Sequence, residues 1–278
     1  MAGKLYLCAT PIGNLGDITA RTLECLKQVD IIAAEDTRNS MKLMTHFDIH
    51  TPLTCYHEYN KYDKADKLVG ELLAGKDIAL ITDAGTPAIS DPGEVLVRKC
   101  QEAGVGVTSL PGPSAVITAL TLSGLPTRRF AFEGFLPQDK TERREILKEL
   151  KDEYRTVVLY EAPHHLINTL SELNEYFGDR KLTIARELTK KHEEILKFTV
   201  CEALSYYEHE EPRGEFVLVL EGRDRQKAEA EKRAFYEEMS PKEHVEKYIS
   251  EGMDRKTAMK QAAKDRGVSK RDIYNALL

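Results

Sequence analysis

Short apolar runs alternate with helix-like segments along the first 123 residues of this chain. The runs predict strands at Lys4–Ala9, Ile31–Ala34, Pro52–Tyr56, Ile78–Ile81 and Val105–Leu110. Between them, apolar residues recur at helical spacing, which predicts helices over Thr19–Val29, up to Phe47, and over Lys64–Ala74, Glu94–Ala103 and up to Leu122. Strands that alternate with helices in this way form βαβ units and a mainly parallel sheet, so we predict an α/β fold.

The loop from Thr82 to Gly93 stands out among the segments that follow these strands. Its sequence, TDAGTPAISDPG, stops the strand Ile78–Ile81 abruptly. Gly85 can adopt backbone angles closed to other residues, and Pro87 fixes its own φ and lacks a donor. Open α/β sheets bind their ligands at the carboxyl ends of the strands, so this loop is a candidate ligand site. Taken alone, such a loop is more often an ordinary strand-to-helix connection.

A second segment begins near Ser123 and contains more strands. We predict strands at Phe130–Phe135, Thr156–Tyr160, Leu182–Arg186 and Glu215–Leu220, with helices over Thr141–Glu153 and up to Phe177. This half is expected to form a mixed sheet of its own. At the end of the first segment, Ser114 is placed to cap the helix that follows it, up to Leu122. The predicted domains are therefore 1–123, 124–222 and a tail, 223–278.

The tail differs from the rest of the chain in charge. Residues 253–278 carry seven Lys and Arg against three Asp and Glu, a local net charge of +4 in a chain of net charge −6. After a charged linker helix over Arg223–Glu238, three short helices with a turn at Gly267 resemble a helix-turn-helix, and Ser269 with Asp272 fits a capping box. Such a module more often only packs on its own chain, but the local positive charge makes binding to a polyanion an equal alternative.

Composition excludes several classes of protein. Hydrophobic residues make up 41% of the 278 residues and charged residues 31%, as in a folded globular protein, and no apolar run is long enough to span a bilayer. Five scattered cysteines without a CxxC pair predict reduced thiols, a cytoplasmic location and no metal site. No GxGxxG, GxxxxGK[ST], HExxH or GxSxG motif is present. A compact, nucleoside-like ligand fits the small-residue loops that remain.

Eight ordered blocks between about residues 4 and 222 resemble one known family. They read LYLCATPIGNLGDIT, AAEDTRNS, LITDAGTPAISDPG, SLPGPSAV, FEGFLP, YEAPHH, ARELTKKHEE and PRGEFVLVLEG. The chain is similar to the family of small-subunit ribosomal RNA methyltransferases within the tetrapyrrole methylase superfamily. It departs from that family's usual pattern at His165, where an arginine is common.

The resemblance implies two α/β domains with S-adenosylmethionine in the cleft between them, and a small helical extension. It implies methylation of the ribose 2′-hydroxyl of a cytidine in 16S ribosomal RNA of the small subunit, by a cytoplasmic homodimer that uses no metal and no membrane. The residues that it places at the cofactor are Pro11, Ile12, Asp83, Ala84, Gly85, Thr86, Pro87, Ile89, Ser114, Ala115, Tyr160, Glu161, Pro212, Arg213 and Gly214.

Transfer of a methyl group to a ribose hydroxyl needs a nearby group that can accept the proton. Candidates on the strand-end loops are Glu35, Asp36, Arg38, His57, Glu58, Arg186, Glu187, Lys190 and His192. Each of them could instead be a helix cap, an ion pair or a surface charge, and Asp36 in particular could simply cap its helix. Our predicted catalytic residues are Glu187, Lys190 and Arg186. Our predicted RNA contacts are Arg38, His57, His164, Lys256, Lys260, Lys264 and Arg271.

Two other functions remain open. A methyltransferase of this fold could act on a tetrapyrrole or another small molecule. The chain could also be a non-catalytic RNA-binding protein. The blocks AAEDTRNS and ARELTKKHEE and the basic tail argue against the first alternative, and the intact cofactor loops argue against the second.

Overall fold

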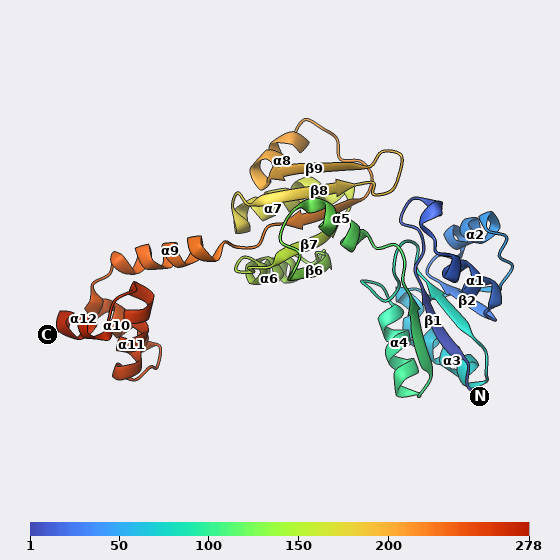
Figure 1. Ribbon diagram of the computed structural model, residues 1–278, viewed down its shortest axis with the longest axis horizontal. Helices are drawn as coiled ribbons and strands as arrows, with labels where there is room; N and C mark the ends of the chain where they lie inside the picture. The colour runs from blue at the N-terminus through green and yellow to red at the C-terminus, as the bar shows by residue number, and fades with distance from the viewer. Residues whose placement is uncertain (278) are drawn as a thin grey trace. The chain divides into compact units, whose positions relative to one another are not determined.

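The computed structural model describes residues 1–277, apart from the side chains of residues 231–233 and 237. Two compact units make up the chain (Figure 1). The first contains residues 1–151 and 155–221, and the second contains residues 152–154 and 222–278.

A five-stranded parallel sheet forms the amino-terminal half of the first unit. Its strand order is β3-β2-β4-β1-β5, and every neighbouring pair is parallel, as predicted. The strands are β1 (Lys4–Cys8), β2 (Ile31–Ala34), β3 (Leu53–Cys55), β4 (Ile78–Ile81) and β5 (Gly106–Leu110).

Alternate residues of these strands face two different helix layers. Ile78 and Leu80 pack with α3 (Lys61–Leu73) and α4 (Gly93–Glu102), while Ala79 and Ile81 pack with α1 (Ala20–Gln28) and α2 (Thr37–His46). Because side chains alternate across a strand, a fully apolar strand such as β4 must be covered on both faces. Two short 3-10 turns, η1 (Leu15–Asp17) and η2 (Glu58–Asn60), lie in the connecting loops.

A mixed five-stranded sheet forms the other half of the first unit, with the order β6-β7-β10-β8-β9. Its strands are β6 (Phe130–Phe135), β7 (Thr156–Glu161), β8 (Lys181–Arg186), β9 (Glu194–Thr199) and β10 (Phe216–Leu220). β6 and β7 are parallel and the other pairs antiparallel, which confirms the mixed sheet. β9 and the helix after it were not predicted. β9 is an edge strand without a fully buried residue, so its apolar alternation is weak.

Helices cover both faces of this sheet. α6 (Lys140–Leu150), α7 (Leu166–Phe177) and α8 (Val200–Tyr207) pack on one face. On the other face lies α5 (Ala115–Ser123), which our sequence-based division had grouped with residues 1–123. Ser114 occupies the N-cap position of α5, but its side chain makes no capping hydrogen bond, so that part of the expectation was wrong.

The helix predicted over Thr141–Glu153 ends earlier, at Leu150. Residues 152–154 belong instead to the second unit, where Asp152 pairs with Arg223 and the Tyr154 ring lies under the Arg225 guanidinium. These contacts tie the short segment 152–154 to the start of the tail.

Helices form most of the second unit: α9 (Arg225–Glu237), α10 (Pro241–Ser250), α11 (Arg255–Arg266) and α12 (Lys270–Ala276). A small core of Val245, Tyr248, Ala258, Met259, Ala262, Ala263 and Ile273 joins the last three. The predicted capping box of Ser269 and Asp272 is confirmed, and Gly267 ends α11 with φ +65°. Among the residues that the structure describes, no helix is long and apolar enough to cross a membrane.

Candidate active site

The loop between β4 and α4 is held in one conformation by its own hydrogen bonds. The Asp91 carboxylate accepts from the backbone N–H groups of Ala88, Ile89 and Gly93, at 2.9, 3.2 and 2.7 Å. Ala88 and Ser90 both adopt positive φ, at 68° and 63°, a conformation that is uncommon for residues other than glycine. Such backbone strain persists only where the surroundings enforce it, and it concentrates at functional sites.

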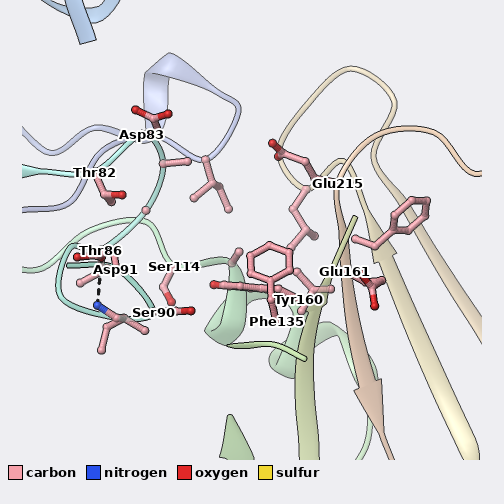
Figure 2. Close-up of a pocket in the computed structure, with 18 of the residues that line it drawn as sticks. Thr82, Asp83, Thr86, Ser90, Asp91, Ser114, Phe135, Tyr160, Glu161 and Glu215 are labelled. Carbon is pink, nitrogen blue, oxygen red and sulfur yellow. Dashed lines mark hydrogen bonds between the residues drawn. The ribbon is translucent and has the colours of Figure 1, made fainter. Parts of the chain in front are cut away.

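A cavity of about 480 Å³ opens within the first unit, between this loop and the second sheet. Its size is in the range of small-molecule and cofactor sites. Figure 2 shows Thr82, Asp83 and Ser114 on one side, and Phe135, Tyr160, Glu161 and Glu215 on the other. Apolar side chains complete the wall, among them Ile12, Ala115, Ala185, Leu188 and Val217.

The charged residues that line the cavity are acidic. The lining includes Glu35, Asp83, Asp91, Glu161 and Glu215, and no lysine, arginine or histidine occurs among the described residues around it. Such a site favours a ligand with positive charge, since opposite charges attract.

Hydrogen bonds from neighbouring residues anchor three of these carboxylates. Asp83 accepts from the backbone N–H of Asp36 at 3.2 Å, where α2 begins, and Glu35 accepts from the Thr82 hydroxyl at 2.8 Å. Glu161 is 6% exposed and accepts hydrogen bonds from the Thr169 hydroxyl and from the backbone N–H of Ala162. Their positions are therefore set before any ligand binds.

Glu215 is held differently, by the three residues that we predicted to be catalytic. The Lys190 ammonium donates to Glu215 Oε2 at 2.9 Å, and Glu187 Oε1 accepts from the backbone N–H of Glu215 at 3.0 Å. Arg186 Nε donates to the carbonyl of Arg213 at 2.8 Å, which fixes the turn just before Glu215. Of these side chains, only that of Glu215 lines the cavity, so the cluster reaches the site through Glu215.

Lys190 and Glu187 also pair directly, with Nζ 2.9 Å from Oε1. Burial raises the pKa of Glu187, but hydrogen bonds from Lys190 and the Glu215 backbone outweigh it and hold that pKa below its ordinary value. Burial lowers the pKa of Lys190, and hydrogen bonds to both carboxylates more than offset this and raise that pKa. Lys190 therefore stays protonated near neutral pH and cannot itself accept a proton.

The structure brings many of the residues predicted for cofactor binding into the lining of one cavity. They are Ile12, Asp83, Ala84, Gly85, Thr86, Ile89, Ser114, Ala115, Tyr160 and Glu161. The other predicted residues do not line it. Pro11 and Pro87 lie in the same loops, and Pro212, Arg213 and Gly214 form the turn before β10. The backbone N–H of each of Thr10 and Gly85 donates to the carbonyl of the other. These two hydrogen bonds join the loop after β1 to the loop after β4.

The residues predicted to contact RNA lie outside the lining. Arg38 is bound to Asp36, whose pKa it lowers to about 2 through side-chain and backbone hydrogen bonds, and Asp36 also caps α2. His57 follows β3 and is half buried, whereas His164 is exposed in the 3-10 turn η3 (Pro163–His165). Lys256, Lys260, Lys264 and Arg271 are exposed on α11 and α12 of the second unit.

Sequence reasoning missed part of the lining. Thr82, Ser90 and Asp91 lie within the predicted loop but were not singled out. The others come from the second sheet: Phe135, Ala162, Pro163, Ala185 and Leu188 lie at the ends of β6, β7 and β8 or just after them, and Glu215, Phe216 and Val217 lie just before β10 or at its start. The blocks FEGFLP, YEAPHH and PRGEFVLVLEG contain most of these residues, so the resemblance to the family could have indicated them as candidate lining residues.

A family model and curated relatives both match most of this chain. The family model for tetrapyrrole (corrin/porphyrin) methylases matches residues 4–204. The curated protein "Ribosomal RNA small subunit methyltransferase I" of Halalkalibacterium halodurans is 50% identical over 98% of this chain and 94% of its own length. The protein of the same name from Bacillus subtilis is 47% identical over 99% of this chain and 94% of its own length. The one from Thermotoga maritima is 46% identical over 80% of this chain and all of its own length.

Solved structures share the fold at low sequence identity. A diphthine synthase superposes with a TM-score of 0.61 at 13% identity, covering 79% of this chain and 90% of that protein. A uroporphyrin-III-C-methyltransferase from Thermus thermophilus superposes with a TM-score of 0.54 at 19% identity, covering 78% of this chain and 94% of that protein. The chain therefore belongs to the tetrapyrrole methylase family, within the group of methyltransferases whose curated members are named ribosomal RNA small subunit methyltransferase I.

Proposed function

We propose that this methyltransferase transfers a methyl group from S-adenosylmethionine to the ribose 2′-hydroxyl of a cytidine in 16S ribosomal RNA of the small subunit. Relatives at 46–50% identity that are named ribosomal RNA small subunit methyltransferase I support ribosomal RNA of the small subunit as the substrate class. The observation that carries the cofactor is the acidic lining of the cavity, which contains five carboxylates and, among the described residues, no basic side chain.

S-adenosylmethionine would supply an activated methyl group on a positively charged sulfonium, together with an adenine and a ribose. The carboxylates Glu35 and Asp83 suit its hydroxyl and cationic groups, and Ile12, Ala115 and Leu188 suit its apolar parts. Gly85 lines the cavity and adopts φ +85°, a backbone conformation that favours glycine, so the backbone itself forms that part of the wall. The residues present therefore fit this cofactor.

Glu215 is the side chain that we propose to accept the hydroxyl proton. Its carboxylate lines the cavity and is 76% exposed, so an incoming ribose can reach it. Lys190, Glu187 and Arg186 then act as positioning residues, since they hold the carboxylate and the backbone of Glu215. Correct placement of reacting groups is a large part of the rate enhancement in such a displacement. Glu215→Gln should lower kcat much more than it weakens the Kd of S-adenosylmethionine, because four other carboxylates of the lining remain.

The second unit is proposed to bind ribosomal RNA. Lys256, Lys260 and Lys264 recur every four residues, which places them on one exposed face of α11, and Lys270 and Arg271 begin α12. Exposed basic residues on one face bind phosphates without reading sequence. Arg38, His57 and His164 remain proposed RNA contacts of the first unit.

We also propose that the protein works in the cytoplasm as a homodimer. A monomeric mass, measured by light scattering at micromolar concentration, would contradict the homodimer.

One experiment separates this function from the tetrapyrrole alternative. The protein is incubated with methyl-labelled S-adenosylmethionine and either undermethylated small ribosomal subunits or uroporphyrinogen. We expect label only in the RNA, and within an alkali-resistant dinucleotide, because a methylated 2′-oxygen cannot attack the adjoining phosphate. Label in the porphyrinogen, in an alkali-sensitive mononucleotide or in neither substrate would contradict the proposal.

A further inference from the structure

Phe135, the last residue of β6, is an aromatic side chain left in solvent at the candidate active site. It lines the cavity and is 58% exposed, whereas large apolar side chains of the second sheet such as Leu159 and Leu218 are buried. Its ring lies 5.4 Å from that of Tyr160, tilted by 55° (Figure 2). Ile89, on the loop across the cavity, is also exposed, at 52%. Exposed apolar surface therefore lies at the cavity, whose charged residues are all acidic among those that the structure describes.

A β-bulge gives Phe135 this position. Phe132 pairs with Val158, Gly134 with Leu159 and Phe135 with Tyr160, so Glu133 is the extra residue. Side chains alternate across a strand, so without the bulge Phe132 and Phe135 would face opposite sides of the sheet. With it, Phe135 shares the face of Phe132 and Tyr160, which is the face toward the cavity. Bulges that re-aim a side chain are frequent beside active sites.

Gly134 within the bulge also lets the opposite loop approach. It has φ +64°, and a Cβ atom there would lie 2.8 Å from the Ser90 hydroxyl. The loop between β4 and α4 thus rests against the backbone just before Phe135. Close packing of Gly134 against Ser90 therefore supports the backbone that carries the Phe135 ring.

We propose that Phe135 stacks on the base of the nucleotide whose ribose is methylated. This inference rests on the proposed function. Enzymes that act on a base in a recessed site take its nucleotide out of the stack. A ribose brought into this cavity would expose its base in the same way, and that base would need a flat partner. Aromatic side chains supply that partner in single-stranded RNA recognition. A cofactor of this size is mostly buried by its pocket, whereas Phe135 lies at the exposed mouth, where the RNA must arrive.

The test compares three substitutions at this position, Phe135→Ala, Phe135→Leu and Phe135→Trp, in the full-length chain. Kinetics are measured with undermethylated small ribosomal subunits, and the Kd of S-adenosylmethionine is measured separately by calorimetry. The matched control is Tyr206→Ala, an exposed aromatic of the same sheet half that lies outside the cavity lining. Thermal unfolding confirms that each variant is folded.

We expect Phe135→Ala to lower kcat/KM for the ribosomal subunit about 5- to 150-fold, mainly by raising KM. This fold-change corresponds to the loss of one base stack, which contributes about 1–3 kcal/mol. Phe135→Trp should restore the activity and Phe135→Leu should not, because leucine is apolar but cannot stack. The Kd of S-adenosylmethionine and the Tyr206→Ala kinetics should be unchanged.

Three outcomes would overturn the inference while leaving the proposed function intact. The first is an unchanged KM in Phe135→Ala, and the second is full rescue by leucine. The third is a weakened Kd for S-adenosylmethionine, which would make Phe135 a cofactor contact. Failure of the unsubstituted chain to methylate the subunit would instead refute the proposed function itself.

Discussion

Gly214 offers a direct test of the cluster that holds Glu215. It adopts φ +86°, and a Cβ atom added there would lie 2.5 Å from Cγ and 2.6 Å from Cδ and Oε1 of Glu187. Real Cβ atoms do not approach other atoms so closely, so Gly214→Ala must displace the Glu187 carboxylate. That carboxylate binds both Lys190 Nζ and the backbone N–H of Glu215.

The expected loss of stability has two parts. An alanine in the left-handed region costs about 1–2 kcal/mol relative to glycine. Losing a hydrogen bond to a charged group costs about 1.5–3 kcal/mol, and water can replace part of it because the Glu187 side chain is 20% exposed. The free energy of unfolding should fall by about 2–4 kcal/mol in total. If Glu215 shifts by about 1 Å, kcat should fall about 100-fold.

Gly104→Ala is the matched control. Gly104 has φ +70°, and a Cβ atom there meets nothing within 4 Å, so only the backbone cost of about 1–2 kcal/mol applies. Urea unfolding and methyl transfer to small ribosomal subunits are measured for both variants. The reasoning is refuted if Gly214→Ala loses no more stability than Gly104→Ala and keeps the kcat of the unsubstituted chain.

Local pattern was enough to predict most of the fold. β4 is a fully apolar run followed at once by turn formers, so its position and the loop after it could be predicted from residues 78–93 alone. The same pattern of an apolar run followed by turn residues predicted other strand ends that lie around the cavity. Edge strand β9 escaped prediction because only one of its sides is paired and none of its residues is fully buried.

Features set by contacts between distant residues could not be predicted. Whether Phe135 faces the cavity depends on a register shift against β7, and Glu133 carries no mark of being the bulged residue. Glu215 follows a recognisable turn, but its partner Lys190 lies 25 residues away and joins it only because β8 and β10 pair. A sequence pattern thus indicates which strand ends form a site, whereas pairing between strands decides which side chains enter it.

Three further outcomes follow from the same geometry. Gly85→Val should weaken binding of S-adenosylmethionine, measured by calorimetry, because a branched residue is strained at φ +85° and adds bulk beside Ile12 in the cavity wall. Unchanged affinity in a folded variant would contradict this. Lys190→Met should lower the free energy of unfolding at pH 7, because Lys190 helps to hold the pKa of Glu187 below its ordinary value of 4.5 in the folded state. The share of this loss that is due to Glu187 should be complete above pH 4.5 and should disappear as the pH falls through the depressed pKa, as measured by urea unfolding across pH. For the second unit, deletion of residues 223–278 would also remove the partners of Asp152 and Tyr154. The cleaner change replaces five exposed basic residues with glutamine: Lys256, Lys260, Lys264, Lys270 and Arg271. That variant should keep its affinity for S-adenosylmethionine, raise the KM for small ribosomal subunits, and flatten the dependence of log K on log salt by about 0.7–0.9 for each RNA phosphate that the protein no longer neutralises. If these helices only pack within their own unit, the same variant will show an unchanged KM and an unchanged salt slope, because the substituted side chains are exposed and contribute little to the core around Met259.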